Sequence, residues 1–297
     1  MSMLTDLSSD LAAVVESAGK AVVRVEGRRR LAASGTVWST DGLVVTANHV
    51  VENEENIKVG LLGDEPTSAE LVGRDPTTDL ALLRISQQSD YTKELTDTTT
   101  LQTGHLALAL GRPGKNIRAC LGIISMLGEE WRTRAGGKID RYILADVPAY
   151  PGFSGGPLVD AAGTISGINT SGLLRGSLIT IPASSVKQVV DELLAKGRIS
   201  RGYLGVGLQP ARLPSDIEKQ LGQETGLLVI SVESGSPADK AGLVLGDTIV
   251  AIGDSIIRRW DDLMYVLAKD LIGIDVTIKI IRAGQLKEVN ATIGEHP

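Results

Sequence analysis

The feature that most constrains the fold of this chain is a succession of short apolar segments separated by turn residues. It extends from about Ala21 to Ile181 and includes AVVRVE, LVVTA, LALLRI, LALALG and ISGINT. Segments of this length, enriched in β-branched residues and bounded by glycine, proline, asparagine and aspartate, are typical of strands. Their number and spacing predict a mainly β fold, a barrel or a sandwich, for the first part of the chain.

One hairpin can be predicted within this region. Asp41-Gly42 lies between TVWST and LVVTA. An Asp-Gly pair between two apolar runs favours a type I′ turn, in which both central residues have positive φ. We therefore expect the two flanking strands to pair in antiparallel fashion.

The pattern becomes helical at residues 185–197. Ser185 and Gln188 have the spacing of a capping box, and Gly197 follows the last turn, where a C-terminal glycine is expected. One helical face would carry Val186, Val189, Val190, Leu193 and Leu194. We expect this helix to end a first domain of residues 1–199. Residues 200–297 alternate strands with two helical segments, SPADKAG and WDDLMYVLAK, which predicts a small α+β domain.

Composition excludes several classes of function. The chain has 297 residues, of which 42% are hydrophobic and 22% charged, and its formal net charge is -6. This is the composition of a globular protein that lacks the positive field needed for nucleic acid, so we expect no nucleic-acid partner. We interpret the one basic run, Arg28 to Arg30, as a solvated loop.

The single cysteine and the N-terminal residues add further expectations. Cys120 alone excludes an intrachain disulfide and a multi-cysteine zinc site, and we expect neither a metal nor a cofactor. The longest apolar run near the N-terminus, LAAVV, is too short for a signal sequence or a membrane span. We therefore expect a cytoplasmic location as encoded, or an extracytoplasmic one if the natural protein carries a targeting segment that this sequence lacks.

The histidines narrow the search for a catalytic base. His296 is the penultimate residue, where chain ends fray, and His105 lies in a turn, where a surface histidine is unremarkable. His49 ends an apolar strand in VVTANHVVE, a position from which an imidazole can face a cleft. By itself, such a histidine is more often structural than catalytic, so its partners decide its role.

Two such partners follow later in the chain. GRDPTTDLALLRI offers Asp75, in a turn, and Asp79, at the head of a strand, where a strand-entry cap is the alternative role. Ser154 stands in GFSGGP, and the glycine two residues before it lets the amides of Gly152 and Ser154 converge on one oxygen. The order along the chain is thus histidine, aspartate, serine.

These blocks resemble a known family. TANHVV, DPTTDLALL and GFSGGPLV are similar to the three active-site blocks of chymotrypsin-like serine proteases. DGLVVTANHVVE, VGRDPTTDLALLRI, GHLALALGRPG and ISGINTSG resemble the HtrA (Deg) family more narrowly, and YLGVGL with GLLVISVESGSPADKAGLVLGDTIVAIGD resembles its PDZ domain. The resemblance implies a chymotrypsin-like double β-barrel protease domain followed by one PDZ domain.

The resemblance also assigns roles to individual residues. His49 matches the general base, Asp79 the carboxylate that orients it, and Ser154 the nucleophile, while the amides of Gly152 and Ser154 would form the oxyanion hole. The segment Gly167 to Pro182 would line the pocket for the residue that precedes the cut. It contains no carboxylate, which predicts an aliphatic preference; the pocket residues we expect are Ile168, Asn169 and Thr170.

Three departures from the family pattern affect what can be expected. Phe153 stands where family members usually have asparagine, and Tyr150 stands where a smaller polar residue is common. Only GRRRLAA fills a place where some members carry a long regulatory loop, so regulation by that loop is not expected. Whether Phe153 holds the oxyanion loop in an active or an idle conformation is left open by the sequence.

In the second domain, YLGV matches the carboxylate-binding loop of this type of PDZ domain. Exposed amides at Tyr203, Leu204, Gly205 and Val206 would capture a peptide C-terminus, and the peptide would then add as a strand. The helix from about Trp260 to Lys269 would form the other wall of the groove. The alternative is that Tyr203 and Leu204 only begin a core strand.

The resemblance implies an ATP-independent serine endopeptidase of protein quality control that cleaves unfolded or misfolded polypeptides. One alternative is a peptide-binding or chaperone-like module with an idle protease site, and another is a hydrolase of esters or other acyl substrates. Family members commonly form trimers through N-terminal residues. Leu4, Leu7 and Leu11 could supply that apolar contact, or they could cap the barrel of their own subunit.

Overall fold

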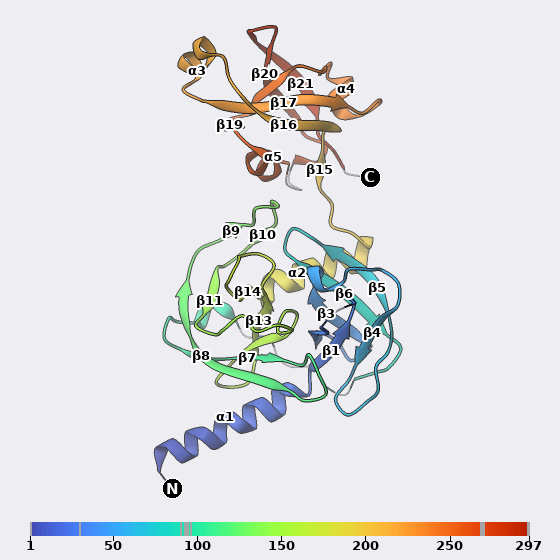
Figure 1. The fold of residues 1–297 in the computed structure, drawn as a ribbon, viewed down its shortest axis with the longest axis vertical. Helices are drawn as coiled ribbons and strands as arrows, with labels where there is room; N and C mark the ends of the chain where they lie inside the picture. Colours follow the sequence, from blue (N-terminus) through green and yellow to red (C-terminus); the bar gives the residue numbers. More distant parts are fainter. Residues whose placement is uncertain are drawn as a thin grey trace. The chain divides into compact units, whose positions relative to one another are not determined.

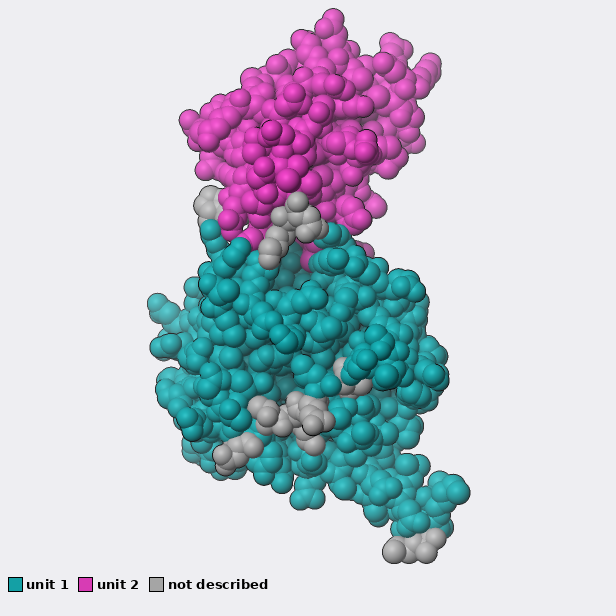
Figure 2. All heavy atoms as spheres, turned by 180° about the vertical axis from the view of Figure 1, so that it is seen from behind, with its two compact units in different colours: residues 1–133, 138–199 teal, residues 134–137, 200–297 magenta. Residues whose placement is uncertain are grey.

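The computed structural model describes residues 2–29, 31–89, 91, 95, 97–267 and 271–295. It divides into two compact units, shown in teal and magenta in Figure 2. The first consists of Met1–Thr133 and Lys138–Ile199, and the second of Arg134–Gly137 and Ser200–Pro297. Arg30, Lys269 and His296, which figured in the sequence-based expectations, lie outside the described residues.

The first barrel of unit 1 is closed and antiparallel, with strand order β1-β2-β3-β6-β5-β4 (Figure 1). Its strands are β1 (Val22–Glu26), β2 (Ala33–Val37), β3 (Leu43–Ala47), β4 (Ile57–Gly60), β5 (Thr67–Asp75) and β6 (Leu80–Ile85). Valine and alanine fill most of its interior, because β-branched and small side chains pack well where strands curve tightly around a narrow core.

The second barrel is also closed, with order β11-β14-β13-β12-β7-β8. It consists of β7 (Leu106–Gly111), β8 (Arg118–Leu127), β11 (Ile143–Ala145), β12 (Pro157–Asp160), β13 (Ile165–Thr170) and β14 (Ile179–Pro182). The described residues of the unit also form a short hairpin of β9 (Trp131–Arg132) and β10 (Lys138–Ile139), two helices, and two 3-10 turns, η1 (Asn48–Val50) and η2 (Thr98–Thr100). The predicted double-barrel architecture is confirmed.

The Asp41-Gly42 connection differs from the predicted type I′ turn. Gly42 has φ of 88°, but Asp41 does not have positive φ. The Trp38 N–H donates to the Leu43 carbonyl at 2.8 Å, and Gly42 N–H approaches the Ser39 carbonyl at 3.4 Å. The loop therefore extends from Ser39 to Gly42, and a longer loop of this kind needs positive φ at the glycine alone.

Helix α2 (Ala183–Lys196) begins two residues before the predicted start. Ser185 is not its N-cap: the hydroxyl bonds the Asp140 carboxylate and accepts from the Asp140 N–H at 3.0 Å. The helix begins early because Pro182 ends β14 and leads directly into the first turn. Gly197 closes the helix in the left-handed conformation, with φ of 71°, as the sequence predicts. Leu194 is 44% exposed and does not join the buried face.

An N-terminal helix, α1 (Met3–Gly19), precedes the barrels and was not predicted from the sequence. Leu11, Val14 and Val15 pack against a cluster of the second barrel that contains Leu108 and Leu110. The first turns of the helix extend away from the barrels in Figure 1, and Leu4 and Leu7 are 76% and 42% exposed. Leu11 thus caps its own subunit, whereas Leu4 and Leu7 do not.

Unit 2 is an α+β domain, as predicted. Its main sheet has the order β16-β17-β18-β20-β21, so β16 lies at an edge. The strands are β15 (Gly202–Tyr203), β16 (Val206–Arg212), β17 (Thr225–Val232), β18 (Thr248–Ile252), β19 (Ser255–Ile256), β20 (Asp275–Arg282), β21 (Gln285–Thr292) and β22 (Gly294–Glu295). The helices are α3 (Ser215–Leu221), α4 (Pro237–Lys240) and α5 (Trp260–Val266).

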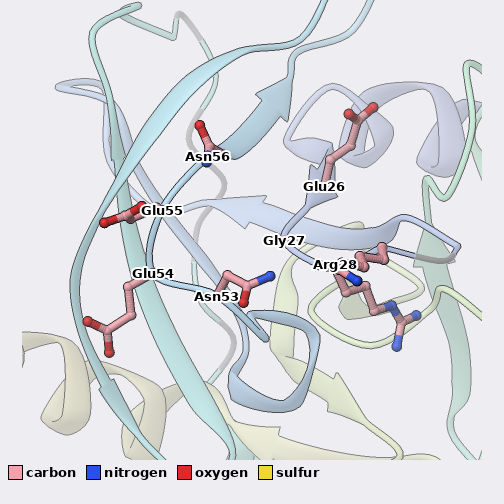
Figure 3. A pocket seen from close by; sticks show the side chains of 8 residues that line it. Glu26, Gly27, Arg28, Asn53, Glu54, Glu55 and Asn56 are labelled. Atoms are coloured by element: carbon pink, nitrogen blue, oxygen red, sulfur yellow. The ribbon is translucent and has the colours of Figure 1, made fainter.

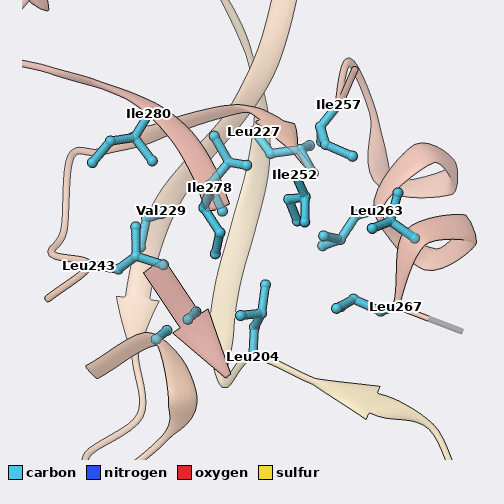
Figure 4. Packing of buried hydrophobic residues seen from close by; sticks show 14 of the residues in the cluster. Leu204, Leu227, Val229, Leu243, Ile252, Ile257, Leu263, Leu267, Ile278 and Ile280 are labelled. Carbon is cyan, nitrogen blue, oxygen red and sulfur yellow. The ribbon is translucent and has the colours of Figure 1, made fainter. Parts of the chain in front are cut away.

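An aliphatic core holds this second unit together. Figure 4 shows Leu204 beneath Leu227, Val229 and Ile278 of the sheet, with Leu263 approaching from α5. All of these side chains are almost fully buried, and each removes apolar surface from water. In the described part of the chain as a whole, no helix has the length and apolar character needed to cross a membrane.

Candidate active site

The pairing of β3 with β6 brings His49 beside Asp79. Ala47 at the end of β3 lies opposite Leu80 at the start of β6, so the residues just beyond this pair meet. His49 Nδ1 is 2.7 Å from Asp79 Oδ2, and the His49 backbone N–H donates to Oδ1 at 2.9 Å. Because an ionised carboxylate only accepts, Nδ1 carries the proton and Nε2 is left as the basic nitrogen.

The last residue of β13, Thr170, and Gly172, just after the strand, complete the surroundings of this pair. The Thr170 hydroxyl donates to Asp79 Oδ2 and accepts from the Gly172 N–H at 2.9 Å. A Cβ on Gly172 would lie 2.4 Å from Asp79 Oδ2 and 2.8 Å from His49 Nδ1. Only glycine can occupy this position without displacing the pair, a requirement that the sequence reasoning missed although NTSG lay within one of the blocks it examined.

Asp75, the other carboxylate of this block, has a structural role. It is 2% exposed and accepts from the Thr77 N–H at 3.0 Å and from the Thr77 and Thr78 hydroxyls. These bonds close the turn between β5 and β6. The turn delivers Asp79 with φ of 59°, a left-handed conformation that aspartate tolerates better than most residues.

Ser154 lies in the loop before β12 and is only 6% exposed. Its carbonyl accepts from the Ser34 N–H at 3.1 Å, which ties this loop to β2 of the first barrel. Its Oγ is 3.1 Å from Ser171 Oγ and accepts from the Ser171 N–H at 3.3 Å. Among the residues that the structure describes, no hydrogen bond joins Ser154 to His49. Ser171 and Gly172 are consecutive, so one segment contacts both Ser154 and the His49–Asp79 pair.

The loop before Ser154 forms a turn that leaves two amides available. Phe153 N–H donates to the Tyr150 carbonyl at 3.2 Å, and Gly152 has φ of 91°. Proline at the second and glycine at the third position are typical of a type II turn. The Ser34 hydroxyl donates to the Gly152 carbonyl at 2.6 Å. Within the described ranges, the N–H groups of Gly152 and Ser154 have no acceptor, so they can serve as an oxyanion hole.

Phe153 anchors this loop in the core of the second barrel. Its side chain is 1% exposed, belongs to a cluster with Ala109 and Leu158, and contacts the Tyr150 ring at 6.0 Å between centroids. The departure from asparagine therefore exchanges a polar side chain for buried apolar packing.

The three residues expected in the substrate pocket are buried in this structure and do not face open space. Ile168, Asn169 and Thr170 are all fully buried. Ile168 packs with Ile181 and Val186, and Asn169 Oδ1 accepts from the Thr180 hydroxyl at 2.8 Å. The Thr170 hydroxyl donates its hydrogen bond to Asp79. Their influence on specificity stays a prediction.

The basic run borders a hollow of about 660 Å³ on the first barrel (Figure 3). Arg28 and Arg29 share it with three carboxylates, Glu26, Glu54 and Glu55, and with the amides of Asn53 and Asn56. The Arg28 guanidinium donates to the Leu31 carbonyl at 2.7 Å. The two described arginines therefore share this hollow with carboxylates and do not form a purely positive patch, in keeping with a solvated loop.

In the predicted carboxylate-binding loop of unit 2, two consecutive residues have bonded carbonyls and, within the described part of the chain, unbonded amides. The Leu204 and Gly205 carbonyls accept from Ala238 and Glu233 amides, both at 2.9 Å, whereas their own N–H groups have no acceptor among the described residues. Gly205 has φ of 76°, and a Cβ there would lie 2.3 Å from Ser236 Cβ.

The side chains around this loop include a buried aliphatic residue, a carboxylate and exposed aromatic rings. Leu204 is buried in the domain core, and β16 begins directly after Gly205. The Tyr203 hydroxyl donates to the Glu233 carboxylate, which raises the pKa of Tyr203 above its ordinary value. In α5, Trp260 and Tyr265 are 46% and 57% exposed. An anionic group bound by the loop would therefore lie near Glu233 as well as near the free amides.

Comparison with known domains agrees with these two units. Residues 33–168 match the trypsin-like peptidase domain, and residues 202–293 match the PDZ domain. Curated relatives include probable periplasmic serine endoproteases described as DegP-like. The one from Chlamydia trachomatis serovar D is 34% identical over 280 residues, and the one from Brucella suis biovar 1 is 36% identical over 274 residues. These alignments cover 92% and 89% of this chain, but 56% and 52% of the relatives, so the chain spans about half their length.

Solved structures match over nearly the whole chain. The HtrA-type protease AlgW with a tripeptide is 33% identical, with 96% of this chain and 97% of that chain covered and a TM-score of 0.66. The serine endoprotease from Yersinia pestis is 29% identical, with 96% and 98% covered and a TM-score of 0.69. Together with the double barrel and the α+β domain that follows it, these matches establish that the chain belongs to the HtrA (Deg) family, with a trypsin-like peptidase domain followed by one PDZ domain.

Proposed function

We propose that this protein is a serine endopeptidase in which His49, Asp79 and Ser154 form the catalytic triad. The observation that carries the proposal is the convergence on Thr170–Gly172: the His49–Asp79 pair lies against Gly172, and Ser154 Oγ lies against Ser171. The relatives named as serine endoproteases support the same reaction.

In the proposed mechanism, the Ser154 hydroxyl turns toward His49 and attacks the carbonyl carbon of the scissile peptide. Its proton passes to His49 Nε2 as the new C–O bond forms, and the carbonyl electron pair moves onto oxygen. The Asp79 carboxylate stabilises the resulting imidazolium and keeps the ring oriented. The free amides of Gly152 and Ser154 would hold the oxyanion, and one such donor is typically worth about 3 kcal/mol.

Collapse of this intermediate breaks the C–N bond, and the imidazolium gives its proton to the departing amine. The acyl group is then carried by Ser154 as an ester. Water attacks the ester carbonyl, His49 takes the proton from that water, and the second intermediate releases the carboxylic acid and restores the Ser154 hydroxyl. No nucleotide takes part in any of these steps.

For the substrate, we propose unfolded or misfolded polypeptides with an aliphatic residue before the cut. In support, the segment from Gly167 to Pro182 carries no carboxylate that would select a basic side chain. We propose that the PDZ domain binds peptide C-termini at Tyr203–Val206 and along the edge strand β16. The free Leu204 and Gly205 amides support this role, as do AlgW structures that contain a peptide.

We further propose a homotrimer, or a multiple of it, in an extracytoplasmic compartment. Exposed Leu4 and Leu7 on α1 supply an apolar surface that a neighbouring copy could cover. The compartment follows from relatives whose names place them in the periplasm.

Digestion of reduced casein, an unfolded protein, tests the proposed activity. We expect the wild-type chain to release peptides in the absence of ATP and Ser154→Ala to release none. Edman or mass-spectrometric mapping of the products should place aliphatic residues before the cuts. The proposal would be refuted if the folded wild-type chain left casein uncleaved over a range of temperatures and with added activating peptides.

A peptide-binding or chaperone-like protein with an idle protease site is the second candidate. It is favoured by one observation, the hydrogen bond of Ser154 with Ser171 in place of His49. In that case, wild type and Ser154→Ala would suppress the aggregation of a denatured protein equally well while neither cleaves it.

A further inference from the structure

Among the residues that the structure describes, Ser171 has the one side chain that hydrogen-bonds to the hydroxyl of the proposed nucleophile. Its Oγ lies 3.1 Å from Ser154 Oγ, and its backbone N–H donates to the same oxygen at 3.3 Å. Neither contact figured among the sequence-based expectations. In this arrangement the Ser154 hydroxyl is engaged with Ser171 and not with the base that must receive its proton.

The direction of the hydroxyl–hydroxyl bond follows from exposure. Ser154 is 6% exposed, so its O–H needs an acceptor within the protein, whereas Ser171 is exposed and can give its own proton to water. Ser154 Oγ already accepts the Ser171 N–H. The arrangement that satisfies every group therefore has Ser154 donating to Ser171 Oγ.

We propose that Ser171 is a positioning residue that holds the Ser154 hydroxyl away from His49 and so limits the fraction of molecules with a reactive nucleophile. The inference rests on the proposed protease function. Rotation of the Ser154 side chain between staggered positions exchanges the bond to Ser171 for one to His49. Ser171 acts on the equilibrium between the two positions and takes no part in bond making.

The size of the effect follows from the strength of one neutral hydrogen bond. Loss of the Ser171 hydroxyl removes one acceptor from the resting position and leaves the reactive position unchanged. A net contribution of about 1 kcal/mol corresponds to about a fivefold increase in the reactive fraction. The gain should appear in the rate of acylation, because peptide binding does not depend on where the Ser154 proton points.

The test compares second-order rate constants for labelling by a fluorophosphonate in wild type, Ser171→Ala, Ser171→Val and Ser171→Thr. Alanine and valine, which lack the hydroxyl, should be labelled about five times faster than wild type. Threonine has the shape of valine but restores the hydroxyl, so it should return labelling toward the wild-type rate. With a peptide substrate, the alanine variant should show a raised kcat.

Ser68→Ala is the matched control, because Ser68 is an exposed serine on β5. The inference would be overturned if Ser171→Ala and Ser171→Val had wild-type melting temperatures but were labelled no faster than wild type. The proposed protease function would be unaffected by that result. Faster labelling of valine and threonine alike would also overturn it, since shape and not the hydroxyl would then be responsible. If neither wild type nor any variant were labelled, both the role of Ser171 and the proposed protease function would be overturned.

Discussion

At the residue scale, the Asp79 carboxylate receives three hydrogen bonds that together orient His49. They come from His49 Nδ1, the His49 backbone N–H and the Thr170 hydroxyl. Thr170 is fully buried, so its hydroxyl has no water as an alternative partner. The carboxylate is consequently held from two sides, and its position sets the direction of the imidazole.

Thr170→Val is expected to lower kcat by roughly 10-fold to 100-fold, because it removes a hydrogen bond to a charged group and keeps the volume of the side chain. Thr170→Ser should recover most of the activity. The measurement is steady-state cleavage of a peptide substrate across a pH series. A valine variant with the wild-type kcat would show that Asp79 does not depend on this donor.

Gly172→Ala should reduce kcat by 100-fold or more. The new Cβ would lie 2.4 Å from Asp79 Oδ2, and a displacement of about 1 Å in a catalytic group costs roughly that much. Gly114→Ala is a suitable control, since no atom lies within 4 Å of its added Cβ. Near-normal turnover in Gly172→Ala would mean that the His49–Asp79 pair is not in use.

The sequence allowed three site residues to be singled out, because few residue types perform this chemistry and the chain has few histidines. It could not show what surrounds them. Gly172 and Ser171 act through contacts with residues far away in the chain, and such contacts follow from the register of β13 against its neighbours. For the same reason, Thr170 was expected in a substrate pocket and is found on Asp79.

At the scale of elements, an ion pair between buried Asp247 and partly exposed Arg282 joins the loop before β18 to the end of β20. Arg282 donates to both carboxylate oxygens at 2.7 Å, and Asp247 is fully buried. Burial of this carboxylate raises its pKa, but the bonds from Arg282 and the Val244 amide and the Arg282 charge lower it more. The net pKa of Asp247 is below its usual value of 3.8.

A depressed pKa stabilises the fold above the pKa of the unfolded chain and ceases to do so as pH falls through the folded value. Asp247→Asn should therefore lower the free energy of unfolding by about 2 kcal/mol near pH 7. The difference in the free energy of unfolding between Asp247→Asn and wild type should shrink below pH 3.8.

Denaturant titrations of both chains at several pH values provide the measurement. Glu288→Gln is the control, because the Lys279–Glu288 pair is exposed and 3.9 Å apart. A difference that persists in acid would contradict the assignment.

Strands were easier to predict than their ends. Period and β-branched composition identify the strand segments, yet the Asp41-Gly42 turn and the start of α2 differ from expectation. The length of the Asp41-Gly42 loop depends on where the hairpin makes its last hydrogen bond, which is between Trp38 and Leu43. The start of α2 depends on where β14 ends, because the helix follows that strand directly. Helices α1 and α3 were missed although the sequence marks their ends: Ser2 caps α1, and Pro214 and Gly222 flank α3.

At the scale of the whole molecule, we propose that unit 1 performs cleavage and unit 2 captures peptides. An undecapeptide with an apolar C-terminal residue should bind the full-length Ser154→Ala chain, and amidation of its C-terminus should weaken binding by roughly 10-fold or more. Gly205→Val should abolish binding, because its Cβ would collide with Ser236. Fluorescence polarisation of the labelled peptide reports the affinity. Equal binding of the acid and the amide would exclude a carboxylate-binding loop.

The central claim is that Ser154 is a nucleophile activated by His49. Its most direct test is mass spectrometry of the wild-type chain after treatment with a fluorophosphonate and digestion. We expect one adduct, on Ser154, that is absent from Ser154→Ala and strongly reduced in His49→Ala. An adduct on another residue, or no adduct on a folded wild-type chain, would contradict it.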